Sequence, residues 1–505
     1  MRRVLAVVVS VVALLGFVAP PVLAQAPAPK VTITGLLDFV TTASKNWSAL
    51  DPTDAKDQEW YSRERGVFTI TGEVGATKAV WAVENDFVNG CIGSVGAGGG
   101  CSAGHGTSSS FDLDTDVAGF VETKWLYVET PVTGPGSLLP FLPMTTRMRA
   151  GAQPARGHEY KNGILLGGDM SGVAFETTWA PNLRSTVTYI QIGEQMEPVS
   201  FFGATEDWAI LASVEFDVFK GFTIKPTYAY ADYTGGNSGT GTLGTETKNG
   251  FTQFGPGGYP LRKTRHTIGG DIRWTVAGFT IQPTFLFQFG DQEIPGATGT
   301  DEVDIRSWIA DVIVGYRIGP LNIEGRAMWT PGMKAGESVL AGDDIEYYQS
   351  INPAFGYMAG WTEIQTSGVD YSTAFMAGAP GVSLRQSPSY DKYGRIFIAL
   401  AADYAITPAL TLKGVVNTSW TDEKVDTNGV LSSAGLSSPT GGDERHLLTE
   451  LNLGMTYRFA PNVAFDLVGA YAWAHEALEN AATAGGPSRD AHDIYKAVAR
   501  VRFTF

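Results

Sequence analysis

Two short stretches of this sequence match patterns that can do chemistry, but neither has the surroundings that the chemistry needs. Gly100-Cys-Ser-Ala-Gly104 fits G-x-S-x-G, the pattern of a nucleophilic serine on a strand-to-helix turn, yet it lies in a Gly-rich loop. Asp112-Leu-Asp-Thr-Asp116 begins like a calcium loop, but Val117 and Thr123 stand where such a loop needs Gly and Glu. We therefore predict no enzyme activity, no catalytic residue, no cofactor and no dedicated metal site. Adventitious Ca²⁺ or Mg²⁺ binding at the acidic loops stays open.

Charged residues are the remaining candidates for function, and they follow a two-residue spacing. They alternate with apolar residues along many segments, so one face of each segment carries nearly all of its charge. A soluble β core cannot bury so many ions without a severe desolvation cost, whereas a water-filled interior removes that cost. We predict that the following residues line an aqueous pore: Arg63, Arg65, Glu122, Lys124, Arg147, Arg149, Arg273, Arg317, Arg326, Arg395, Glu450, Arg458, Lys496, Arg500 and Arg502.

The last segment of the chain, residues 493–505, shows this alternation most clearly. Lys496, Arg500 and Arg502 fall on one parity, while apolar residues occupy the other parity up to the final residue, Phe505. Successive side chains of a strand point to opposite faces. The segment is therefore predicted to be a strand with one apolar face and one mostly cationic face.

The same unit repeats along the whole chain: an alternating strand, a short turn, another alternating strand and a longer polar loop. Trp179-Ala-Pro-Asn-Leu183 and Phe459-Ala-Pro-Asn-Val463 are typical Pro-containing short turns. The connection 131–143 is unusually long for the end of the strands at which the short turns lie. Trp and Tyr residues gather near strand ends, as in the aromatic belts of membrane proteins. We predict about 18 strands, at 31–43, 62–74, 78–88, 117–130, 144–153, 170–180, 183–194, 206–219, 222–232, 264–277, 279–290, 303–318, 321–331, 393–406, 410–421, 444–459, 463–475 and 492–505.

The N-terminus predicts export. Arg2 and Arg3 precede an apolar run over residues 4–18, and Val22-Leu-Ala24 ends it, which is the layout of a secretory signal peptide. We expect residues 1–24 to be removed and residues 25–505 to form one barrel. In an exported protein the only two cysteines, Cys91 and Cys101, are expected to form a disulfide.

Composition restricts the partners and the fold class. The chain has 36 Lys and Arg against 52 Asp and Glu, a net charge of −16, which argues against nucleic acid as a partner. No stretch after the signal peptide reaches the ~18 consecutive apolar residues of a membrane-spanning helix. Because only helices and closed barrels can cross lipid, an all-β chain of this kind would cross it as an antiparallel up-and-down barrel.

The terminal Phe505, the short turns and the long opposite loops resemble bacterial outer-membrane porins over essentially the whole mature chain. The resemblance implies a transmembrane barrel of 16 to 18 strands, with short periplasmic turns and long extracellular loops, in the outer membrane of a Gram-negative cell. It implies a channel for passive diffusion of small hydrophilic solutes or ions. It further implies Phe505 as a signal for the barrel-assembly machinery, and contacts with outer-membrane lipids and lipopolysaccharide. A homotrimer is left open.

Two other functions stay open from the sequence. One is a substrate-specific or polysaccharide (alginate-type) export barrel, which a continuous Arg and Lys track would favour; the mixed charges count mildly against it. The other is the structural barrel sheath of an electron-conduit complex. Because the sequence has no C-x-x-C-H motif, the haem of such a complex would have to come from a partner.

Two connections are candidates for the narrowest part of the pore. The first is the aromatic-rich connection 331–392, and the second is 154–169. The cations Arg147, Arg149, Arg500 and Arg502 are expected to form a ladder on one side of the pore. We expect them to give it weak anion preference.

Overall fold

The computed structural model describes most of the chain. The described residues are 28–47, 58–89, 110–111, 122–155, 157–161, 163–193, 207–233, 262–295, 300–337, 339, 342–351, 360–366, 368–370, 388–428, 430–432, 435–437, 441–481 and 486–505. Within them the chain is almost wholly β, with two short 3₁₀ helices, η2 (Asp391–Tyr393) and η3 (Glu476–Leu478). No helix in these ranges is long and apolar enough to cross a membrane.

Eighteen long strands of the described residues form one closed antiparallel ring, in which each strand pairs with its neighbours in the sequence. The strands form where polar and apolar residues alternate along the sequence. The predicted number of strands is confirmed. The strands are β1 (Lys30–Lys45), β2 (Gln58–Val74), β3 (Thr77–Asn89), β5 (Glu122–Pro131), β6 (Thr145–Pro154), β7 (Asp169–Ala180), β8 (Leu183–Gly193), β9 (Asp207–Phe219), β10 (Phe222–Tyr233), β11 (Lys263–Val276), β12 (Phe279–Pro295), β13 (Thr300–Ile318), β14 (Leu321–Thr330), β15 (Arg395–Ala405), β16 (Leu410–Val425), β19 (Glu444–Ala460), β20 (Val463–Ala474) and β23 (Ile494–Thr504).

Five very short strands among the described residues were not predicted. They belong to the long connections, where a two- or three-residue strand leaves no alternating pattern to detect. They are β4 (Ser110–Phe111), β17 (Val430–Ser432), β18 (Gly435–Ser437), β21 (Asn480–Ala481) and β22 (Ser488–Arg489). Two pairs of them form small hairpins, β17 with β18 and β21 with β22.

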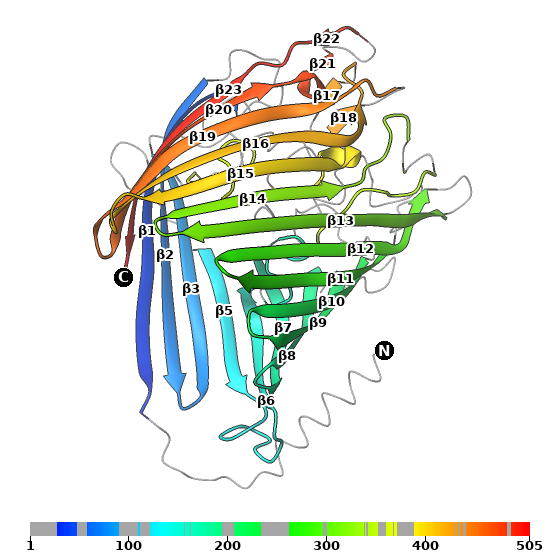
Figure 1. Cartoon of the computed structure of the whole chain (residues 1–505). Coiled ribbons are helices and arrows are strands. Elements are labelled where there is room, and N and C mark those ends of the chain that lie inside the picture. Colours follow the sequence, from blue (N-terminus) through cyan, green and yellow to red (C-terminus); the bar gives the residue numbers. More distant parts are fainter. Residues whose placement is uncertain are drawn as a thin grey trace.

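The ring closes where the last strand meets the first. β23 pairs with β20 on one side and with β1 on the other, so the two ends of the sheet leave no open edge. Gly35 N donates to Phe505 O at 2.8 Å, and Phe505 N donates to Gly35 O at 3.0 Å. Both chain ends of the barrel therefore lie on the rim that carries the short turns, as Figure 1 shows.

The two faces of the wall differ in polarity. Large apolar side chains on the outer face remain exposed, among them Leu453 and Leu126 at 63 % and 60 %. Exposed Trp residues stand near the strand ends at both rims, such as Trp179 at the short-turn end and Trp473 at the loop end. The predicted apolar outer surface is confirmed, and it suits lipid with aromatic rings near the headgroups.

The ring of Phe505 covers Gly35, where β23 meets β1. We expect a substitution of Gly35 to make the closed barrel less stable. In Gly35→Ala the added Cβ would lie 2.3 Å from Cζ of Phe505 and displace the ring. Since aromatic contacts contribute about 1 kcal/mol, the folded, heat-modifiable form should be lost at a lower temperature on detergent gels. Gly72→Ala is the matched control, because nothing lies within 4 Å of its added Cβ. Equal midpoints would show that the ring adds nothing to closure.

Candidate pore constriction

Charged side chains of the wall point into the barrel, and most of them form ion pairs across neighbouring strands. Arg149 and Arg147 share the Glu129 carboxylate, at 2.7 and 2.8 Å, and Lys78 lies 3.2 Å from it. The predicted ladder is therefore not a row of free cations, because carboxylates of adjacent strands neutralise it. Other predicted pore cations also pair with carboxylates, either of neighbouring strands or of the connection between β14 and β15: Arg63 with Asp370, Arg65 and Lys124 with Glu84, Arg326 with Asp311, Lys496 with Glu363 and Asp370, Arg500 with Asp466, and Arg502 with Asp38.

Six further predicted pore residues have different surroundings. Arg273 lies over the ring of Tyr160, 4.0 Å from its centroid, and Arg395 and Glu450 contact an inward-folded loop described below. Arg317 and Arg458 are exposed near the short-turn ends of β13 and β19, on the inward parity of their strands. Glu122 pairs through its backbone with β3, and its side chain lies outside the described residues.

The connection between β6 and β7 folds into the barrel. Lys161 Nζ donates to Thr284 Oγ1 of β12 at 2.6 Å and lies 3.8 Å from Asp311 of β13. His158 Nε2 lies 2.8 Å from Thr188 Oγ1 of β8. A loop that joins β6 to β7 and bonds to β12 and β13 has to cross the lumen. This segment, residues 157–161 and 163–168, is called the inner loop here, and it is the second of the two predicted constriction candidates.

The inner loop is held in shape by one buried carboxylate. Glu159 accepts hydrogen bonds from the backbone N–H groups of Gly163 at 2.8 Å, Leu165 at 2.7 Å and Leu166 at 3.4 Å. The following ring, Tyr160, lies against Lys225 and Arg273 of the wall. The loop is thus a compact structure with its own internal bonds and several anchors on the wall.

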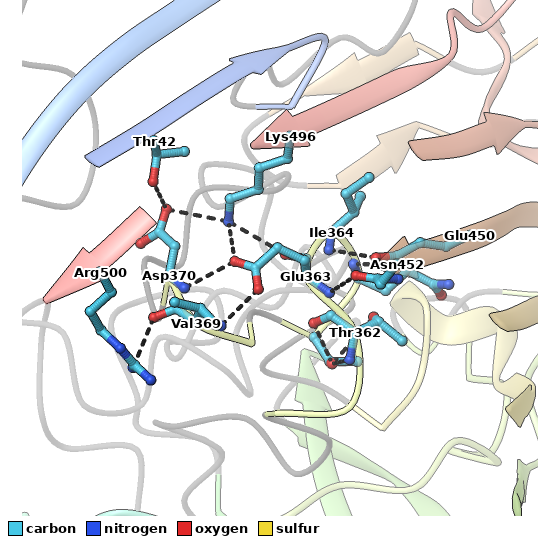
Figure 2. A network of polar contacts seen from close by, with 12 residues as sticks. Thr42, Thr362, Glu363, Ile364, Val369, Asp370, Glu450, Asn452, Lys496 and Arg500 are labelled. Atoms are coloured by element: carbon cyan, nitrogen blue, oxygen red, sulfur yellow. Dashed lines mark hydrogen bonds and ion pairs between the residues drawn. The ribbon is translucent and has the colours of Figure 1, made fainter. Parts of the chain in front are cut away.

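The connection between β14 and β15 also enters the barrel. Its residues 360–366 and 368–370, called the strap, lie against β23, β1 and β2, as Figure 2 shows for β23 and β1. Asp370 accepts from Arg63 at 2.8 Å and from Thr42 at 2.8 Å, and lies 3.3 Å from Lys496. The hydroxyl of Tyr61 also donates to it. One carboxylate of the strap thereby joins side chains from three strands on both sides of the closing seam.

A second strap carboxylate sits beside the first. Glu363 lies 3.3 Å from Lys496 and accepts the backbone N–H groups of Val369 at 2.7 Å and Asp370 at 2.9 Å. Burial would raise the pKa of Asp370, but Lys496 and Arg63 outweigh it and hold that pKa well below its usual range. Burial raises the pKa of Glu363, and Lys496 only partly opposes this. Asp370 is therefore the charge that fixes the strap to the wall.

The other side of the strap is bound by β15 and β19. Glu450 accepts the backbone N–H groups of Ile364 at 2.8 Å and Gln365 at 3.1 Å, and Asn452 Oδ1 accepts that of Glu363 at 2.8 Å (Figure 2). Arg395 donates to the Gln365 side chain at 3.0 Å. The strap, part of the first predicted constriction candidate, is thus an inward-folded segment with anchors on six strands, since Ser419 Oγ of β16 also donates to Gln365 at 2.7 Å.

The two inward connections meet, and where they meet the interior is apolar. Tyr348 OH donates to Ile164 O at 2.9 Å, and Ile351 N donates to Leu165 O at 2.8 Å. Part of the interior is therefore a packed apolar core, because loop residues cover inward apolar side chains of the wall. The alternation of residues along the sequence did not distinguish this buried cluster from residues that face lipid. The cluster includes Ile164, Leu165, Leu166, Leu211, Leu286, Ile309, Met328, Tyr348, Ile351 and Phe397.

A cavity of about 370 Å³ remains on the short-turn side of the inner loop. It is lined by charged and hydroxyl-bearing residues of the wall together with Gly157 of the inner loop: Lys78, Glu129, Arg149, Glu176, Thr177, Thr178, Arg184, Ser185, Thr186, Ser213, Glu215 and Lys225. Its polar lining suits water and small hydrophilic solutes. Arg149 is the member of the predicted ladder that reaches it.

Several predicted features cannot be placed. Cys91 and Cys101, the acidic stretch 112–116 and the signal peptide 1–24 lie outside the described residues, so the disulfide, the adventitious cation site and the cleavage stay predictions. Within the described part of the chain, no cluster of three or more His, Cys, Asp or Glu side chains is placed to hold a metal ion.

Comparisons with known proteins bear on the fold only. No family model matches the sequence, and no curated protein matches it significantly. Similar solved structures include Pseudomonas aeruginosa OccK10 (OpdN), 11 % identical with a TM-score of 0.47, covering 94 % of this chain and 99 % of that one. Pseudomonas aeruginosa OpdK with vanillate is 9 % identical with a TM-score of 0.47, covering 94 % and 98 %. At these values the strand pairing itself remains the evidence for the barrel.

The binding of the inner loop to the barrel wall, called docking here, is expected to be weakest near pH 8. Burial raises the pKa of Glu159 from 4.5 to about 8, so docking weakens as pH rises between these values. Burial lowers the pKa of Lys161 from 10.5 to about 8, so above pH 8 docking strengthens again. Hydrogen–deuterium exchange of residues 157–168, corrected for the intrinsic rate, should show protection falling about tenfold from pH 5 to 8.

The variant Glu159→Gln provides the control for this profile. It keeps the size of the side chain and removes the group that titrates, so the fall between pH 5 and 8 should disappear. An identical profile in the variant and the natural chain would show that Glu159 does not couple to docking.

Proposed function

We propose that this protein is a channel of the bacterial outer membrane through which small hydrophilic solutes or ions diffuse passively. The observation that carries the proposal is the contrast between the faces of one closed wall. The outer face exposes Leu, Phe, Val and Trp side chains, and the inner face holds ions and hydroxyls around a polar cavity. Lipid outside and water inside would each meet the surface that suits it.

The closed ring supports location in a membrane. Every long strand among the described residues has a partner on both sides, so its backbone groups pair within the protein. That is the condition for crossing lipid without helices. The predicted signal peptide would export the chain, and barrels of this kind belong to the outer membrane of bacteria.

The inner loop and the strap would form the constriction and limit the size of the solute. Both segments cross the interior, and their anchors include buried ion pairs. A wide path for a polysaccharide is less well supported, because loops cross it and the wall cations are paired with carboxylates. A sheath around a partner would likewise need the volume that these two segments occupy.

Releasing the strap should widen the channel. Asp370→Asn removes the charge that Arg63 and Lys496 face, and breaking a buried ion pair from one side costs ~3–5 kcal/mol. Single-channel recordings in planar bilayers should show higher conductance and switching between levels. Asp38→Asn is the matched control, since buried Asp38 of β1 pairs with Arg502 of β23, a residue of the wall and not of the strap. Steady, unchanged conductance in Asp370→Asn would exclude the strap as the constriction.

The wall charges should set a weak selectivity that mutation can move. In Arg147→Gln with Arg149→Gln, Glu129 loses both arginine partners and keeps Lys78 at 3.2 Å. A unit charge at ~10 Å in water is worth about 0.4 kcal/mol, or about two-fold in local ion concentration. The reversal potential in a salt gradient should therefore shift toward cations without loss of conductance. A reversal potential indifferent to both substitutions would place selectivity outside this part of the wall.

A further inference from the structure

One turn on the short-turn rim differs from the rest. β7 and β8 are joined by Pro181 and Asn182 alone, whereas β5 and β6 are joined by residues 132–144, called the rim turn here. It forms the cyan loop at the foot of β6 in Figure 1. No charged residue occurs from Thr130 to Thr146. A long, uncharged and apolar turn at an aqueous rim has no part in the constriction.

The rim turn is held in one shape by its own hydrogen bonds. Thr133 Oγ1 donates to Met144 O and accepts from Thr146 N, both at 2.8 Å. Ser137 N donates to Gly134 O at 3.2 Å. Three prolines further restrict the backbone of the turn. The turn is therefore a preformed projection whose ordering cost has already been met by folding.

The projection presents apolar side chains outward. Phe141 is 77 % exposed and Leu138 is 45 % exposed, and Pro135, Pro140 and Pro143 are exposed as well. The turn directly follows β5, whose outer face exposes Leu126 and Val128. The exposed apolar residues of the turn therefore lie close along the chain to the apolar outer face of β5.

We propose that the rim turn lies in the headgroup region of the bilayer, with Phe141 and Leu138 inserted between lipids beside β5 and β6. Two large side chains and three prolines are far too little surface for a stable protein interface, which needs ~800 Å² per partner. The same side chains suffice against lipid, because the barrel already holds them at the membrane and no further translational freedom is lost. The absence of charge removes the main barrier to entering the interface.

Insertion would fix the base of the β5–β6 hairpin relative to the bilayer. Glu129 and Arg149 of these two strands line the polar cavity, and Arg147 beside the turn shares Glu129. The turn would thereby serve as a foot that steadies the wall at the short-turn mouth. Its role is independent of which solute passes the channel.

The test places a polarity-sensitive fluorophore on the turn. Phe141→Cys, in a chain that also carries Cys91→Ser and Cys101→Ser, is labelled and reconstituted into vesicles of phosphatidylethanolamine and phosphatidylglycerol. Val501→Cys on the lipid face is the positive control, and Asn462→Cys on the β19–β20 turn is the aqueous control. The label at 141 should emit at wavelengths near those at 501 and be quenched by spin-labelled lipid but not by iodide.

Three results would overturn the proposal. Emission and iodide quenching like those at 462 would place the turn in water. Protection from both quenchers would place it against protein, such as a second copy of the chain. Lipid quenching at 501 together with none at 141 would show a correctly inserted barrel whose turn stays outside the bilayer, and quenching at 501 also confirms that the reconstitution itself succeeded.

Discussion

The barrel depends on one constraint: in lipid, each backbone N–H and C=O must pair within the protein. Antiparallel neighbours meet this demand along the ring, but only the pairing of β23 with β1 removes the two remaining edges. The last residue completes that seam, since Phe505 exchanges two backbone hydrogen bonds with Gly35. Closure then creates the two environments on which everything else depends, an apolar exterior and an enclosed interior. The alternation of side chains along each strand supplies both surfaces at once.

The enclosed interior changes the energetics of charge. An exposed ion pair contributes little, but many ion pairs inside the ring are buried, and a buried ion needs a partner. The wall supplies partners on neighbouring strands, as when Arg147 and Arg149 share Glu129. A loop also provides carboxylates for wall cations. Asp370 does this for Arg63 and Lys496, so the position of the strap and the charge balance of the wall depend on each other.

The interior is also more protein-like than an open pore. The inner loop and the connection 331–394 meet over an apolar cluster, so part of the lumen is a packed core and part is a polar cavity. These segments contribute apolar burial, which is favourable in the usual way, and ion pairs, which fix their position. A solute would have to pass between elements that are anchored on opposite walls. In the proposed channel, this arrangement would restrict solutes by size and charge.

The sequence by itself determined the eighteen long strands, the short turns between them and the alternation of faces along each strand, because a two-residue period needs only local information. The inward placement of residues such as Arg149 and Arg500 follows from the same period. The sequence did not reveal that carboxylates neutralise these cations. Asp466 and Asp370 reach Arg500 and Arg63 only because of the strand register and the folding of a loop. The apolar core around Leu165 and Phe397 was hidden for a related reason: an apolar side chain facing lipid and one covered by a loop look alike along the chain. The tertiary structure decided these points, because contacts between residues hundreds of positions apart form only when the ring has closed.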